Sequence, residues 1–154
     1  MKIDNATKLL LVFYLLMCTV ILGCGTTKKA ITDIATWSIE LKKGGCLDNC
    51  ISYNIVIRQD GSYLYNGKYN VKYLGDKSGK LGTKKIAVID GLVTGSNWNS
   101  FKSEYGTQAE DSQRKEINYN ADRINKKVVY FRMEPQEIKE IEAYLDILIQ
   151  SDEF

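Results

Sequence analysis

Apolar and polar residues alternate in short runs over the middle of the chain, a pattern typical of β-strands that bury one face. The apolar positions of these runs are Trp37, Ile39 and Leu41; Tyr53, Ile55 and Ile57; Tyr63 and Tyr65; and Tyr69, Val71 and Tyr73. Asp60-Gly61 and Asn66-Gly67 separate the last three runs, and both dipeptides favour tight hairpin turns. The pattern therefore predicts an antiparallel meander of four strands, followed by a loop at the Gly- and Lys-rich residues 75–82.

The second half of the chain predicts two helices and a later hairpin. Apolar residues at helical spacing mark residues 84–93, and Trp98, Phe101 and Tyr105 continue the pattern as a helix or two short ones. Alternation returns at 117–121, and an apolar run at 128–131 follows a turn. Beyond Pro135, which a first helical turn tolerates, the apolar residues are Ile138, Ile141, Leu145, Leu148 and Ile149. The expected fold class is α+β, an antiparallel sheet with a middle helix and a C-terminal helix packed on one face.

The N-terminal apolar run predicts export rather than a membrane span. Leu9 to Leu22 is 14 residues, preceded by Lys2 and Lys8, whereas a transmembrane helix needs about 20. A basic start followed by 7–15 apolar residues is typical of a secretory signal. The residues before Cys24 resemble a lipobox, which implies cleavage after Gly23 and acyl chains on Cys24. The alternatives are a signal anchor and an ordinary cleaved signal.

This interpretation divides the chain into three parts. Residues 1–23 are expected to be a removed lipoprotein signal peptide, residues 24–35 a lipidated cysteine and tether, and residues 36–150 a single domain. Two or three acyl chains hold a protein stably, since each buried methylene contributes about 0.8 kcal/mol. Gly25 follows Cys24, and the resemblance to lipoproteins, in which Asp at this position is associated with inner-membrane retention, implies the outer membrane, facing the periplasm. The expected partners are the membrane, through Cys24, and another envelope protein.

Charge and composition narrow the chemistry. The formal net charge is +2 and there is no histidine, so neither a nucleic-acid partner nor a histidine-based triad or metal site is expected. We expect no cofactor, no metal and no catalytic residue. An enzyme built on tyrosines or on Glu104, Glu110 and Asp111 is the weaker alternative. Lys77, Lys80, Lys84 and Lys85 form a basic stretch that is either solvated or faces anionic headgroups.

The four cysteines sort by position. Cys18 would leave with the signal and Cys24 would be lipidated, so Cys46 and Cys50 remain. In an oxidising compartment this pair favours a disulfide. A redox-active dithiol and a copper(I) site of two thiolates are the alternatives.

Five tyrosines are the candidate binding surface: Tyr53, Tyr63, Tyr65, Tyr69 and Tyr73. If the strands alternate as predicted, several of these side chains share a sheet face. Tyrosine combines an apolar ring with a polar tip and is common at interfaces. It also simply favours strands, so a structural role is the competing interpretation.

The segment from Ile39 to Gly67 resembles the start of the domain of unknown function 6438 family, found in bacterial lipoproteins, many from Bacteroidota. The matching features are Cys46, Cys50, Tyr53, Asp60-Gly61, Tyr65 and Gly67, and the resemblance covers roughly Thr36 to Gln150. Ile51 stands where the family usually has proline, and Asn49 where it usually has glycine. The resemblance implies a fold and a location but brings no activity. We therefore expect a non-catalytic binding or structural module of the cell envelope, with a periplasmic thiol-redox or copper(I) protein as the alternative.

Overall fold

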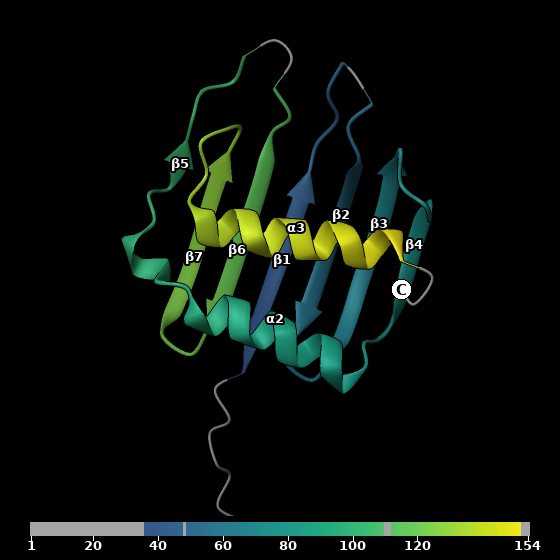
Figure 1. Ribbon diagram of the computed structural model, residues 1–154, viewed down its shortest axis with the longest axis vertical. Coiled ribbons are helices and arrows are strands. Elements are labelled where there is room, and N and C mark those ends of the chain that lie inside the picture. The colour runs from purple at the N-terminus through teal and green to yellow at the C-terminus, as the bar shows by residue number, and fades with distance from the viewer. Residues whose placement is uncertain (1–35, 48, 110–111, 152–154) are drawn as a thin grey trace, which may run out of the picture. The chain divides into compact units, whose positions relative to one another are not determined.

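A computed structural model describes residues 36–47, 49–109 and 112–151, which form a seven-stranded sheet with two α-helices across one face (Figure 1). The α+β class is thus confirmed. The strands are β1 (Trp37–Lys43), β2 (Ser52–Arg58), β3 (Ser62–Tyr69), β4 (Gly75–Lys80), β5 (Glu104–Tyr105), β6 (Lys115–Ala121) and β7 (Ile124–Tyr130). The helices are α2 (Thr83–Gly95), the 3-10 turn η2 (Trp98–Ser100) and α3 (Gln136–Gln150).

The strands lie in the order β4-β3-β2-β1-β6-β7-β5. All neighbours are antiparallel except β5, which runs parallel to β7. The two central strands align Ile39 with Tyr119 and Leu41 with Ile117. This register puts every second residue of β1 and β6 on the same face, so the sequence alternation becomes one continuous apolar surface.

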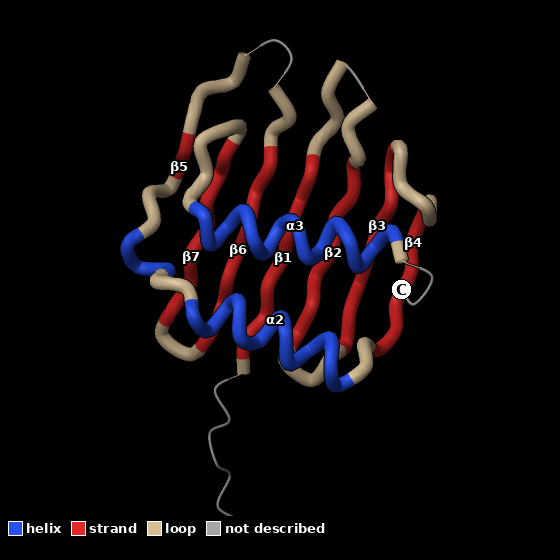
Figure 2. The backbone as a smooth tube through the Cα atoms, viewed as in Figure 1, coloured by secondary structure: helices blue, strands red, loops and turns tan. Residues whose placement is uncertain are grey.

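The core lies between this surface and the two helices. Helix α2 buries Ile89 and Val93, and α3 buries an apolar stripe composed of Ile138, Ile141, Leu145, Leu148 and Ile149. Each such side chain contributes about 1.5–3 kcal/mol by leaving water. Trp98 fills the space beside the sheet, where its ring stacks on Tyr119 at 4.5 Å between centroids. The helices therefore cover one face, here called the covered face, and leave the opposite, open face without a helix in the described part of the chain (Figure 2).

Two predicted elements near residue 70 were wrong. Asn66-Gly67 is not a hairpin turn but lies inside β3, and of the strand expected at 69–73 only Tyr69 is in a strand, as the last residue of β3, while 70–73 are a connection. Residues 75–80, expected in a loop, form β4. Gly67 serves close packing instead of a turn: a Cβ there would collide with the backbone oxygen of Tyr73. Strand β4 carries no alternation because almost all of it is exposed on both faces.

The segment after α2 also differs from expectation. Its aromatic spacing predicted helix, but only η2 is helical, and Tyr105 belongs to the short parallel strand β5. Trp98 and Phe101 are buried there in an edge-on ring contact of 5.5 Å. The apolar spacing of three thus reflects packing of a turn rather than a full helix.

The N-terminal predictions fall elsewhere. The predicted signal at 1–23 and the tether at 24–35, including Cys24, lie outside the described residues. Among the residues that are described, no helix combines the length and the apolar character needed to cross a membrane.

Candidate functional site at the disulfide end of the sheet

Four connections meet at one end of the sheet, the end at which β1 finishes. Their described residues are 44–47 with 49–51, 70–74, 106–109 with 112–114, and 131–135 (Figure 2). We call this the disulfide end, because the first connection carries the Cys46–Cys50 bond. The first strand begins at the opposite end, with Thr36 immediately before it.

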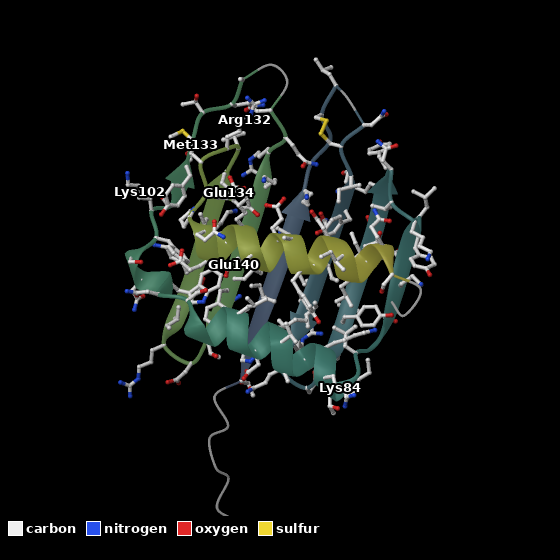
Figure 3. The ribbon with its side chains drawn as sticks, in the orientation of Figure 1. Lys84, Lys102, Arg132, Met133, Glu134 and Glu140 are labelled. Carbon is white, nitrogen blue, oxygen red and sulfur yellow. A yellow bond between two sulfur atoms is a disulfide. The ribbon has the colours of Figure 1, made fainter. Side chains whose placement is uncertain are left out.

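The predicted disulfide is present in the structure. Cys46 and Cys50 are joined, with their Cα atoms 5.9 Å apart, and Figure 3 shows the bond within this connection, between the end of β1 and the tip of the loop. A bonded pair offers no thiolate to copper(I) and no nucleophile. The thiol-redox and copper(I) alternatives therefore need a reduced form of the protein, and they stay predictions.

A glutamine from another connection holds the disulfide loop. The side-chain nitrogen of Gln113 donates to the backbone oxygens of Gly44 at 2.6 Å and Ile51 at 2.7 Å, one at each end of the loop. The backbone nitrogen of Gly44 donates to Arg114 at 2.9 Å. The hydroxyl of Ser52 donates to the oxygen of Lys43 at 2.9 Å. Hydrogen bonds thus fix both ends of the loop, and the disulfide joins its two sides between them.

A cluster of buried charges lies directly beneath these loops, between the sheet and α3. Lys43 is the last residue of β1, and its ammonium is 2.7 Å from both Glu142 and Asp146 of α3. Lys115, the first residue of β6, lies directly opposite Lys43 in the antiparallel pairing of β1 with β6. Its ammonium lies 2.9 Å from Glu142 and 3.3 Å from Glu134. Glu142 therefore bridges two lysines, and the cluster holds α3 on the sheet.

Two tyrosines complete the charge cluster. The hydroxyl of Tyr53 donates to Asp146 at 2.7 Å, and the ammonium of Lys115 lies 4.6 Å from the centre of the Tyr130 ring. Burial raises the pKa of Tyr53 well above its ordinary value, and Asp146 raises it further. Burial, with the charge of Glu142, likewise raises the pKa of Tyr130. Both phenols therefore stay protonated and act as donors or ring surfaces, not as bases.

The central carboxylate stays charged. Burial alone would raise the pKa of Glu142, but the nearby ammonium of Lys43 and the hydrogen bonds from Lys43 and Lys115 outweigh burial and lower it. Each carboxylate of the cluster thus has a lysine or a tyrosine against it. Within the described ranges, no three His, Cys, Asp or Glu side chains converge as a metal site. The arrangement supports a rigid base for the loops rather than acid–base chemistry.

The loops above this base carry exposed apolar side chains. Leu47 is 79% exposed, Leu74 69% and Met133 83%, and Tyr69, the last residue of β3 beside these loops, is 65% exposed. Met133 also has a positive φ of 66°, a conformation that costs a non-glycine residue about 1 kcal/mol or more. Arg132 and Met133 lie together at this end (Figure 3). The exposed apolar residues of three connections thus gather at the disulfide end.

The predicted tyrosine surface requires correction. Tyr53, Tyr63 and Tyr65 are buried in the core, because they lie on the covered face and not on the open one. Tyr73 is half-buried, with the ammonium of Lys77 3.4 Å from its ring centre. Of the five, only Tyr69 is strongly exposed. Alternation correctly implied that tyrosines share a face, but the face is occupied by the protein's own helices.

The open face carries a second polar cluster, centred on Glu116. Its carboxylate accepts from Lys127 at 2.9 Å, Arg114 at 3.1 Å and Asn118 at 3.2 Å. Burial would raise its pKa, but these hydrogen bonds lower the pKa of Glu116 to about 2. The three donors hold the Glu116 carboxylate in its charged form against the sheet, and we assign this cluster a structural role.

Sequence reasoning overlooked the charge cluster, although a signal was available. Lys43 continues the inward positions 37, 39 and 41, and Lys115 precedes the inward positions 117 and 119. Glu142 and Asp146 are four residues apart and lie on the buried side of α3. Charges at core-facing positions of three elements indicate mutual pairing, since an isolated buried charge is costly. Of the other predicted carboxylates, Glu104 lies in β5, whereas 110–111 lie outside the described residues.

Comparison with known proteins gives one result. The family described as "Domain of unknown function (DUF6438)" matches residues 37–149, from the start of β1 almost to the end of α3. No curated protein matches the chain, and no solved structure does.

Proposed function

The chain belongs to the DUF6438 family, and from this premise we propose that it is a lipid-anchored module of the cell envelope whose disulfide end binds another envelope protein. The anchor would be acyl chains on Cys24, with the domain at the outer membrane and facing the periplasm. The proposed role is non-catalytic, because the charged side chains of the buried cluster pair with one another and hold α3 on the sheet.

One observation carries the binding proposal: four of the seven large apolar side chains that are exposed in the described residues lie at the end away from the point where the chain enters β1, namely Leu47, Tyr69, Leu74 and Met133. Strand β1 is seven residues long, so its two ends are about 20 Å apart. Cys24 precedes Thr36 by twelve residues, which span at most about 40 Å. Because the chain enters the sheet at Thr36, a lipid on Cys24 would be linked through this tether to the end of the sheet opposite Leu47 and Met133.

The rigid base of this end favours binding. Methionine and tyrosine are enriched at protein interfaces, and Met133 and Tyr69 are both exposed here. The disulfide and Gln113 fix the loop of Leu47 before any partner arrives. Ordering a mobile loop reduces affinity, whereas a fixed loop avoids that cost. The loop carrying Leu47 is thus suited to present an apolar side chain at low entropic cost.

The anchor is tested by labelling cells with a clickable palmitate analogue and analysing the purified chain by mass spectrometry. The proposal expects a label on the peptide that begins at Cys24, and none on the Cys24→Ala variant. The variant should leave the membrane fraction. An unlabelled chain that begins at any other residue would contradict the anchor without bearing on the binding surface.

The binding surface is tested by crosslinking in cells, followed by quantitative mass spectrometry. Leu47→Asp and Met133→Asp place a charge on the proposed surface, and each should reduce the specific crosslinked species at least tenfold. Ile147→Asp is the matched control, because Ile147 is also 70% exposed but lies on α3. All three variants should melt like the parent protein. Equal loss in all three, or in none, would contradict the assignment.

A further inference from the structure

We propose that the outer edge of β4 binds an extended acidic segment of a partner protein by strand addition. This inference concerns a different surface from the disulfide end, and it depends neither on the anchor nor on Leu47 and Met133. It rests on the free edge of the sheet, on the charge gathered along it and on the way β4 is held in place.

Strand β4 is the last strand of the sheet on its side. It pairs with β3 from Gly67↔Gly75 to Ser62↔Lys80, and in the described part of the chain no element lies beyond it (Figure 1). A strand paired on one side directs alternate backbone N–H and C=O groups outward. Five of its six residues are exposed. The edge therefore offers a backbone template about 20 Å long.

The edge is strongly basic. Residues 68–85 carry six lysines and a single acid, Asp76. The rest of residues 36–151 carries eleven basic and fourteen acidic residues, so positive charge is concentrated around β4 while the remainder is net negative. Two of these lysines, Lys72 and Lys77, have their ammonium groups 5.6 and 3.4 Å from the Tyr73 ring centre. Positive charge is thus held close beside the strand.

The distribution of the lysines favours an extended chain over a flat surface. Lys68 lies near the disulfide end, next to the last residue of β3. Lys80, the last residue of β4, lies at the opposite end of the sheet, and Figure 3 shows Lys84 there too. The charges therefore follow the length of β4. A membrane surface offers no backbone that pairs with the outward N–H and C=O groups of β4. A second copy of the chain would bring two lysine-rich edges together, which like charges oppose.

The strand is already in a pairing conformation. Tyr63 lies against Gly79, where an added Cβ would come within 2.9 Å of the tyrosine ring. Asn66 donates to Asp76 at 2.6 Å across the β3–β4 pair. Gly75 has no atom within 4 Å of an added Cβ, so the start of the strand is open. A partner strand would meet an ordered edge, and its main-chain hydrogen bonds would supply affinity while acidic side chains supply selectivity.

The probe for this proposal is a ten-residue peptide of alternating Glu and Val, with a Lys-Val peptide and a Glu-Pro peptide as controls. The full chain is titrated in detergent, and binding is followed by fluorescence anisotropy. The Glu-Val peptide should bind, and binding should weaken as salt rises. The Lys-Val peptide lacks the complementary charge and the Glu-Pro peptide lacks half of the backbone N–H donors, so neither should bind comparably.

The variant Lys80→Glu/Lys84→Glu should bind the Glu-Val peptide at least tenfold more weakly than the parent protein. The matched control is Lys102→Glu/Lys139→Glu, which makes the same change at exposed lysines outside the 68–85 segment, and it should change binding less than threefold. Hydrogen exchange supplies the second readout: backbone amides of 75–80 should gain protection when the peptide binds.

Three results would overturn the proposal. One is binding of the Glu-Val peptide without protection of the β4 amides from hydrogen exchange, which would show that charge attraction alone holds the peptide. Another is binding to phosphatidylglycerol vesicles, lost in Lys80→Glu/Lys84→Glu, with no binding of the peptide. The third is concentration-dependent self-association that protects β4 in the absence of peptide. Leu47→Asp and Met133→Asp should leave peptide binding unchanged, so this test and that of the disulfide end fail separately.

Discussion

Replacing Lys43 by methionine tests whether the buried charge cluster holds α3 on the sheet. The ammonium of Lys43 lies 2.7 Å from both Glu142 and Asp146, and its side chain is only 5% exposed. Methionine keeps most of the apolar stem but removes the charge. Among the described residues, Glu142 then retains Lys115 as its partner, and Asp146 retains the hydroxyl of Tyr53.

The expected loss is large because the remaining carboxylates are poorly compensated. Removing one partner of a buried ion pair costs 3–5 kcal/mol in typical proteins. Since both carboxylates keep one partner, we expect a loss near the lower value, about 3 kcal/mol in the free energy of unfolding. In a domain of this size that corresponds to a fall of about 10 °C in melting temperature. Lys42→Met is the control: Lys42 is 40% exposed, and an exposed pair contributes about 0–1 kcal/mol.

The assay is urea unfolding of the parent and both variants, repeated as the pH is lowered. The cluster holds the pKa of Glu142 below its ordinary value of 4.5. The stability this provides is present above that value and is lost as the pH falls through the folded pKa. The difference between parent and Lys43→Met should therefore narrow in acid. A loss no greater than that of Lys42→Met, or a difference that widens on acidification, would refute the reasoning.

Three further predictions concern single side chains. The Glu116 carboxyl should titrate near pH 2 by carbon NMR, since its pKa is about 2. The stability that it contributes above pH 4.5 should disappear as the pH falls through 2. A titration midpoint above pH 4 would contradict the hydrogen bonds that hold this carboxylate charged. Gly67→Ala should destabilise by about 3 kcal/mol in urea unfolding, whereas Gly82→Ala, with no atom near its Cβ, should cost under 1 kcal/mol; equal costs would argue against close packing at 67. Gln113→Ala should cost about 2 kcal/mol by losing two hydrogen bonds and speed hydrogen exchange in the disulfide loop, while Gln136→Ala on the surface should do neither.

The sequence allowed prediction of the elements that bury one face. Strands β1, β2 and β6 alternate because one side meets the helices, and α3 shows an apolar stripe for the same reason. Strand β4 could not be found this way, because its exposure on both sides removes the pattern. Gly67 misled the prediction, since a glycine required by a close contact looks in sequence like a glycine required by a turn.

The candidate site was less predictable than the fold. The disulfide followed from the two remaining cysteines and is present. The tyrosine surface failed because alternation tells which residues share a face but not which face the helices cover. The exposed apolar residues Leu47 and Met133 belong to separate connections, and only the sheet order brings those connections to one end. The buried charges could have been found, because Lys43 and Glu142 stand at inward positions.

The most direct test of the central claim is site-specific photo-crosslinking from two positions of the anchored protein in living cells. A crosslinking amino acid at position 133 probes the disulfide end, and one at position 123 probes the other end, where the side chain of Arg123 is 95% exposed. We predict a discrete crosslinked envelope protein from position 133 that disappears when Leu47→Asp is added, and no such species from position 123. The same species from both positions, or from position 123 alone, would contradict the assignment of the disulfide end as the binding surface.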